Sequence, residues 1–331
     1  MEPGNRRFEE TVFMEKLAMP SLNYVTILIA AFTSLVASPL VAQTAQPRPG
    51  SASPAAQAAP SAASQPAAAV ADQKRPPRAK TQGELDAYQK FMREQSPDEQ
   101  VKLIEDFLLN FPNTELKEYA YQAATQAYQS KNDFEKVLTY GELTLTENEY
   151  NLVALLVLSS AIPERTGKTD LDKESKLAQA EQYAQRGLEV LAKLPMPPNL
   201  TEEQWAQVRK DAESTPHAAL GMIYLIREDF SKAESEFKMA SEMASKPDPV
   251  TFYRLGLSYS FEKKYEPALD ALGKAAGAGG LKVQGPDGAA RDLVAEAKDF
   301  VVKAKAASES PVSGATVAPP APVSAPASAR P

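Results

Sequence analysis

The chain has 331 residues, a formal net charge of −7 and no cysteine. The negative charge disfavours nucleic acids as partners, and the lack of cysteine excludes disulfides, thiol nucleophiles and cysteine-bound zinc within this sequence. Proline, alanine and serine are concentrated near the two ends, so only part of the chain is expected to fold.

The N-terminal segment, residues 1–43, is predicted to direct export. Residues 24–42 read YVTILIAAFTSLVASPLVA, an apolar run that follows basic residues and precedes small ones, as in a secretory signal peptide. Cleavage is expected after Ala42 or Ala45. An uncleaved anchor is the alternative, because about 19 apolar residues just reach across a bilayer. In both cases we expect the rest of the chain in the periplasm or outside the cell, with membrane contact limited to this segment. Met14 and Met19 are alternative translation starts, either of which would shorten the segment before the apolar run.

Residues 44–80 and 308–331 are rich in proline, alanine and serine and lack large apolar side chains. Such segments cannot bury enough surface to offset their chain entropy. We expect a disordered linker and a disordered tail, which leaves residues 81–307 as the folded domain.

The first predicted hairpin opens this domain. A helix over residues 84–95 is followed by the sequence Ser-Pro-Asp-Glu. Ser96 is expected to be the N-cap of a second helix, with Glu99 completing a capping box. That second helix is expected to end near Phe111.

The next two hairpins follow a looser pattern. Tyr121, Ala124 and Tyr128 mark the buried face of one first helix. The pattern recurs 34 residues later, beginning at Leu155. Its partner helix is delayed by a polar insertion, residues 163–175, which is expected to form a loop.

A further capping-box signature stands at Thr201 and Gln204, and it opens another predicted helix. Pro216 follows within the same stretch. Because proline lacks an amide hydrogen and crowds the preceding turn, it is expected to break or kink this helix.

Two segments, residues 214–247 and 249–282, match each other at a spacing of 35 residues. The first carries His217, Leu220, Gly221 and Tyr224, then Ala233 and Phe237; the second carries Phe252, Leu255, Gly256 and Tyr259, then Ala268 and Leu272. Intervals of three and four residues put the first four of each set on one helix face, and the glycine lets a partner helix approach closely. A single hairpin of this kind cannot cover its outer face, so neighbours must stack.

The last part of the domain differs from the repeats. Residues 276–288 are rich in glycine and predict a loop. Residues 289–307 predict an amphipathic helix that caps the final hairpin.

The repeated residues resemble the tetratricopeptide-repeat motif, W-x2-L-G-x2-Y followed by A-x3-F. The resemblance covers about residues 84–307. It implies an all-α, right-handed superhelical solenoid of about five antiparallel helix hairpins with a C-terminal capping helix. It also implies that the first helix of each hairpin lines a concave face, which receives a protein or peptide partner.

The residues expected to face that partner are Tyr119, Gln122, Gln126, Gln129, Met222, Tyr253 and Leu257. The family's best-known peptide site clamps a terminal carboxylate with lysine and asparagine, and the matching positions here lack both. Apolar anchors and amide hydrogen bonds are expected instead.

No catalytic residue, cofactor or metal site is predicted. His217, the single histidine of the sequence, occupies the aromatic position of the motif, where packing between helices is the expected role. We expect an exported, non-catalytic adaptor, in cell-envelope assembly or secretion. Two alternatives stay open: a helper subunit anchored in the membrane by its N-terminus, and a carboxylate-dependent hydrolase built on a helical solenoid.

Overall fold

The computed structural model describes residues 77–167, 169–284 and 288–309. The predicted signal peptide or anchor, residues 1–43, lies outside the described residues, as do most of the predicted linker and tail. None of the helices in the described ranges is both long enough and apolar enough to cross a membrane.

The secondary structure of the described residues consists of α-helices and one short β-hairpin. In chain order the helices are α3 (Gln82–Arg93), α4 (Pro97–Asn110), α5 (Lys117–Ser130), α6 (Phe134–Glu147), α7 (Leu152–Arg165), α8 (Lys173–Lys193), α9 (Glu202–Ile226), α10 (Phe230–Met243), α11 (Pro249–Phe261), α12 (Tyr265–Gly277) and α13 (Leu293–Glu309). Strands β1 (Lys282–Gln284) and β2 (Ala290–Asp292) lie between α12 and α13.

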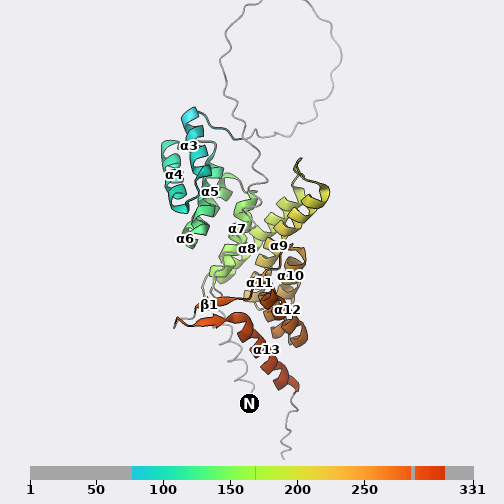
Figure 1. Ribbon diagram of the computed structural model, residues 1–331. Coiled ribbons are helices and arrows are strands. Elements are labelled where there is room, and N and C mark those ends of the chain that lie inside the picture. The colour runs from blue at the N-terminus through green and yellow to red at the C-terminus, as the bar shows by residue number, and fades with distance from the viewer. Residues whose placement is uncertain (1–76, 168, 285–287, 310–331) are drawn as a thin grey trace, which may run out of the picture.

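The helices pack as consecutive antiparallel pairs, and each pair packs on the next. Figure 1 shows the resulting elongated stack, with α3 and α4 at one end and α13 at the other. The described part therefore contains five hairpins and a terminal helix, which confirms the all-α solenoid predicted from the repeats.

Three of the hairpins turn through the same backbone motif. Asn132, Glu228 and Lys263 stand at equivalent positions and have φ of 57°, 62° and 62°. In each turn the next residue donates its N–H to the carbonyl of the motif tyrosine five residues back, at 2.9–3.0 Å, as in the Schellman motif. The donor and acceptor pairs are Asp133 and Tyr128, Asp229 and Tyr224, and Lys264 and Tyr259.

The motif glycines allow the two helices of a hairpin to touch, as predicted. A Cβ atom on Gly221 would lie 2.7 Å from two ring atoms of Phe237 in the partner helix. A Cβ atom on Gly256 would lie 2.7 Å from Cγ of Leu272. Both distances are well below van der Waals contact, so a larger residue would have to displace the facing side chain or push the two helices of the hairpin apart.

The second hairpin reverses this arrangement of small and large residues. Thr125 stands at the glycine position of α5, and Gly141 stands in α6 where α10 has Phe237. The space beside Gly141 is filled from the next hairpin, because a Cβ there would lie 2.7 Å from Cδ2 of Leu158. Glycine thus also marks a close helix contact here, but it stands in the second helix of its hairpin, and the contact is between α6 and α7.

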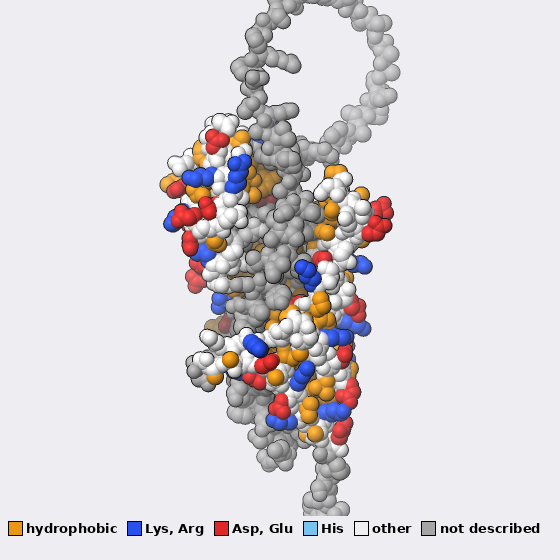
Figure 2. Space-filling model, in the orientation of Figure 1, with side chains coloured by type: hydrophobic (Ala, Val, Ile, Leu, Met, Phe, Trp, Pro, Cys, Tyr) orange, Lys and Arg blue, Asp and Glu red, His pale blue; other side chains and the backbone are white. Residues whose placement is uncertain are grey.

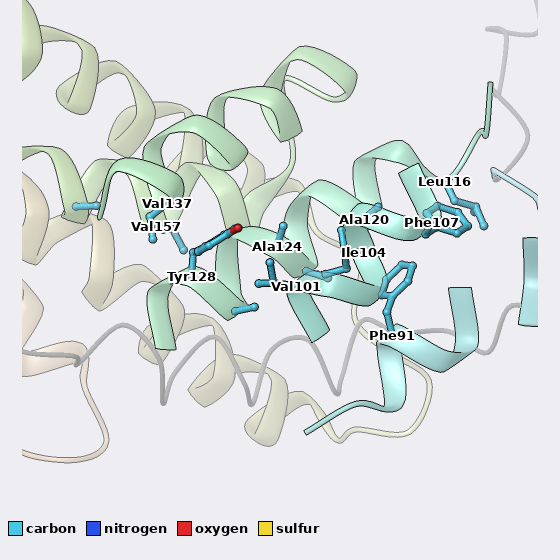
Figure 3. Packing of buried hydrophobic residues seen from close by; sticks show 13 residues of the cluster. Phe91, Val101, Ile104, Phe107, Leu116, Ala120, Ala124, Tyr128, Val137 and Val157 are labelled. Atoms are coloured by element: carbon cyan, nitrogen blue, oxygen red, sulfur yellow. The ribbon is translucent and has the colours of Figure 1, made fainter. Parts of the chain in front are cut away.

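The core runs along the interior of the stack as a series of clusters. The first joins α3 to α7, and Figure 3 shows its side chains meeting between the helices. Phe91, Ile104 and Phe107 are at most 1% exposed. Phe91 and Phe107 meet edge to face, with ring centroids 5.3 Å apart. These rings fill the end of the stack, where no further hairpin among the described residues is available to cover α3.

One of the two predicted capping boxes is present. Thr201 Oγ1 accepts a hydrogen bond from the N–H of Gln204, and Gln204 Oε1 accepts one from the N–H of Thr201. Ser96 is the N-cap residue of α4, as predicted, but the capping box predicted there is absent, because the Ser96 hydroxyl makes no capping bond. Instead, Glu94 Oε1 accepts from the Ser96 N–H at 2.8 Å, which leaves the start of α4 to its N-terminal proline and acidic first turn.

Helix α9 runs through Pro216 without a break over 25 residues, so the break, one of the two predicted outcomes, does not occur. Trp205 and Ala212 before the proline and Leu220 and Ile223 after it are all buried. Since α9 packs against α7, α8 and α10, burial on both sides outweighs the roughly 3 kcal/mol that an internal proline costs.

The segment predicted as a loop contains the β-hairpin, in which Val283 pairs with Arg291. Leu281 and Leu293 flank it, both are at most 4% exposed, and the N–H of Leu293 donates to the carbonyl of Leu281 at 2.9 Å. Their burial in one cluster brings the two strands together. As a result, the capping helix begins at Leu293, four residues later than predicted, and continues to Glu309.

Candidate functional site

Helix α5 carries a line of polar side chains along one face. Tyr119, Gln122, Gln126 and Gln129 are spaced by three, four and three residues, which aligns them along a helix over about 15 Å. All four are half-buried, whereas Ala120, Ala123, Ala124 and Ala127 between them are buried in the core. The structure therefore brings these four predicted partner-facing residues together, and we call them the α5 row.

A hydrogen-bond network fixes one end of the row. Glu118 Oε1 accepts from the side-chain amides of Asn148 and Asn151, both at 2.7 Å. Asn151 also donates to Gln122 Oε1 at 2.9 Å, and its own Oδ1 caps α7 by accepting from the N–H of Ala154. Because Gln122 uses its oxygen here, its Nε2 group is left as a donor.

Sequence reasoning identified Gln122 but missed Glu118, Asn148 and Asn151. The two asparagines stand just before a predicted helix, where asparagine is a common cap. That signal was present for Asn151, although nothing in the sequence indicated that it would reach back to α5.

Tyr119 at the start of the row packs edge-on against Tyr88 of α3, with ring centroids 6.3 Å apart. Burial raises the pKa of the Tyr119 hydroxyl, and the neighbouring Glu118 carboxylate raises it further. The phenol therefore keeps its proton at neutral pH and can donate a hydrogen bond. The row as a whole is uncharged and offers both donors and acceptors.

The other three predicted residues lie in the interior instead of on a partner-facing surface. Tyr253 is 1% exposed and Leu257 is 2% exposed. Both pack in a cluster with Leu293, Val294 and Val301, so α13 covers this part of α11. The repeat pattern specifies which face of α11 packs on α12, but it does not specify which face a terminal helix will cover.

Met222 is 8% exposed and packs with Leu225, Phe237 and Leu255 between α9, α10 and α11. It is therefore part of the contact between the fourth and fifth hairpins. The structure does not bring Met222, Tyr253 or Leu257 to the α5 row.

His217 lies between α9 and α10, where its Nδ1 is 2.7 Å from Glu236 Oε2. Their side chains are 14% and 18% exposed, so this pair forms part of the packing within one hairpin. Within residues 77–309, as far as they are described, no three His, Cys, Asp or Glu side chains are grouped so as to hold a metal ion.

Charged side chains of both signs alternate on the face of the molecule seen in Figure 2, over α9 to α13. Among the charged residues that the structure describes, several tie neighbouring hairpins together. Arg227 donates to Glu181 at 2.7 Å and to Glu174 at 3.1 Å, and Lys264 pairs with Glu234 at 2.6 Å. No single sign of charge dominates the visible face, in contrast to a surface built to attract a polyanion.

No family model matches the sequence, and no curated protein matches it. Thirteen chains of solved structures match. One of them is a thermophilic tetratricopeptide-repeat protein of Thermus thermophilus, with 17% sequence identity and a TM-score of 0.42; the match covers 67% of this chain and 98% of that chain.

Proposed function

We propose that this protein is a non-catalytic interaction scaffold that holds an extended segment of a partner protein along the α5 row. The observation that carries the proposal is the row itself: three glutamines and a tyrosine aligned on one helix face and half-exposed, beside a network that orients Gln122. These side chains are suited to binding a polypeptide backbone and offer no nucleophile or charged acid–base pair.

The chemistry of the row matches that of an extended peptide. Each residue of such a peptide presents one N–H and one carbonyl, and a glutamine side chain can bond to both. At about 3.3 Å per residue, the roughly 15 Å of the row spans four to five peptide residues. Because the row is uncharged, it discriminates little between partner peptides of different charge. Selectivity would come from contacts with apolar side chains of the partner, and Tyr119 is the aromatic residue of the row that such side chains can contact.

Export is the second part of the proposal, and it rests on the apolar run of residues 24–42. We place the scaffold in the cell envelope or outside the cell. N-terminal sequencing of the protein from fractionated cells tests this. A mature chain beginning after Ala42 or Ala45 supports export with cleavage, and an intact N-terminus in the membrane fraction supports an anchor. Intact protein confined to the cytoplasm would overturn the placement.

Site-specific photo-cross-linking in living cells tests the α5 row. A photo-reactive amino acid replaces Gln126 in the full chain, and the same residue replaces Gln185, an exposed glutamine on α8, as the matched control. A defined protein cross-linked from position 126 and not from 185 supports the row and identifies the partner. The variant Gln129→Ala, which leaves the network at Gln122 intact, should then reduce that cross-link at unchanged thermal stability. Equal cross-linking from both positions would refute the site.

A further inference from the structure

The third and fifth hairpins are joined by a buried ion pair. Arg254 Nη2 donates to Glu164 Oε1 at 3.0 Å, across 90 residues of sequence. Glu164 lies in the last turn of α7, and Arg254 lies in the middle of α11. In a solenoid each repeat ordinarily contacts only its neighbours, so a bond that skips the fourth hairpin needs a geometric reason.

The reason lies in how the first helices of the hairpins are arranged. Helix α9 packs against both α7 and α11. All three are first helices of their hairpins. When a row of hairpins curves, its elements converge on the inner side and separate on the outer side. A bond across α9 can therefore form only where the first helices converge, which places Arg254 and Glu164 on the concave side.

The pair is also shielded from solvent. The side chains of Arg254 and Glu164 are 8% and 18% exposed. By comparison, Lys264 in the neighbouring pair with Glu234 is 46% exposed. Salt screens a shielded pair much less than an exposed one, and removing one member leaves the other charge buried without it. The bond between α7 and α11 is therefore costly to break.

We infer that Arg254 and Glu164 form a clasp that fixes the curvature of the solenoid between its third and fifth hairpins. With the clasp closed, the width of the concave side is fixed. The position of the second hairpin, with its α5 row, is then fixed relative to α11. With the clasp open, the stack relaxes to a more extended shape. The inference concerns the shape of the protein without a partner and does not depend on the proposed peptide site.

A distance measurement between the two ends of the stack tests the clasp. The chain has no cysteine, so two introduced cysteines can be labelled cleanly. Leu109 and Val302 are 79% and 52% exposed, and they belong to α4 and α13, the helices near opposite ends of the stack in Figure 1. Single-molecule fluorescence energy transfer between dyes at these positions reports the end-to-end distance of the full chain.

The variant Glu164→Gln removes the negative charge from the clasp, and Glu234→Gln is the matched control. The side chain of Glu234 is 20% exposed, an exposed fraction similar to the 18% of Glu164. Its partner Lys264, however, stands in the adjacent hairpin, so this pair does not skip a hairpin. We expect Glu164→Gln to lower the transfer efficiency, which corresponds to a longer distance between the dyes. Glu234→Gln should leave the efficiency unchanged. The exchanged pair Glu164→Arg/Arg254→Glu should restore the wild-type distance distribution.

A wild-type distance distribution in folded Glu164→Gln would overturn the clasp. If Glu164→Gln loses its helical circular dichroism, the double variant Glu164→Gln/Arg254→Gln replaces it, because it removes both charges. That double variant should show the same shift toward longer distances, and a wild-type distribution in it would again overturn the inference.

Discussion

Replacing Gly221 by alanine tests whether close helix contact is what requires glycine in the repeat. The added Cβ would lie 2.7 Å from Cδ1 and Cε1 of Phe237 and 2.9 Å from its Cγ. Phe237 is fully buried, at 0% exposure, so its ring has no free space into which it can move. Forcing a methyl group into a packed core costs about 1–3 kcal/mol.

Helix propensity acts in the opposite direction, because alanine is favoured over glycine in a helix by about 1 kcal/mol. We expect Gly221→Ala to be destabilised by about 1 kcal/mol net. Gly273 in α12 is the matched control: it is exposed, and a Cβ there would meet nothing within 4 Å. Gly273→Ala should therefore gain about 1 kcal/mol of stability from propensity alone.

Urea unfolding followed by circular dichroism measures both free energies on the full chain. The prediction is a difference of about 2 kcal/mol between the two variants, with opposite signs relative to wild type. If Gly221→Ala is as stable as Gly273→Ala, the ring of Phe237 tolerates the methyl group. Contact between α9 and α10 would then not explain the glycine.

Three further predictions concern stability and pH. Glu228→Gly should stabilise the protein by about 0.5–1 kcal/mol in urea unfolding, because a φ of 62° is strained for glutamate and not for glycine; a loss of stability would refute this. Burial acts to raise the pKa of Glu181, but hydrogen bonds from Arg227 and Tyr224 outweigh it and lower the pKa below 4.5. The stability that Glu181 contributes should thus be present above about pH 4.5 and be lost as the pH falls through its folded-state pKa. The difference in melting temperature between wild type and Glu181→Gln should therefore shrink in acid. A difference that stays constant with pH would contradict the lowered pKa of Glu181. Tyr253→Phe should leave the melting temperature unchanged or raise it, because the buried Tyr253 hydroxyl has no hydrogen-bond partner among the described residues; a marked fall would show that this hydroxyl makes a stabilising hydrogen bond.

Much of the fold could be predicted because the signals were local. Intervals of three and four residues between His217, Leu220 and Tyr224 depend only on helix geometry. The glycine positions could be predicted for the same reason, since a residue without a side chain inside an apolar stripe marks close contact. The capping box at Thr201 is likewise complete within four residues.

The predictions failed where distant parts of the chain decide the outcome. Pro216 has a strong local preference to end a helix, but three neighbouring helices hold α9 together through it. The strands β1 and β2 form because Leu281 and Leu293 are buried in one cluster, which no pattern in the glycine-rich segment revealed. The same applies to Tyr253 and Leu257, which α13 covers.

The sequence by itself determined that this protein is a stack of helical hairpins and which face of each helix is apolar, because those properties depend on residues a few positions apart. The tertiary structure alone decided which inner-face residues remain accessible and which residues of distant hairpins meet. Gln122 and Tyr253 stand at equivalent positions, six residues before the motif tyrosine of their hairpins, yet Gln122 is half-buried and Tyr253 is covered by α13. Curvature sums small rotations over many contacts, and only the folded chain brings Arg254 to Glu164 across 90 residues.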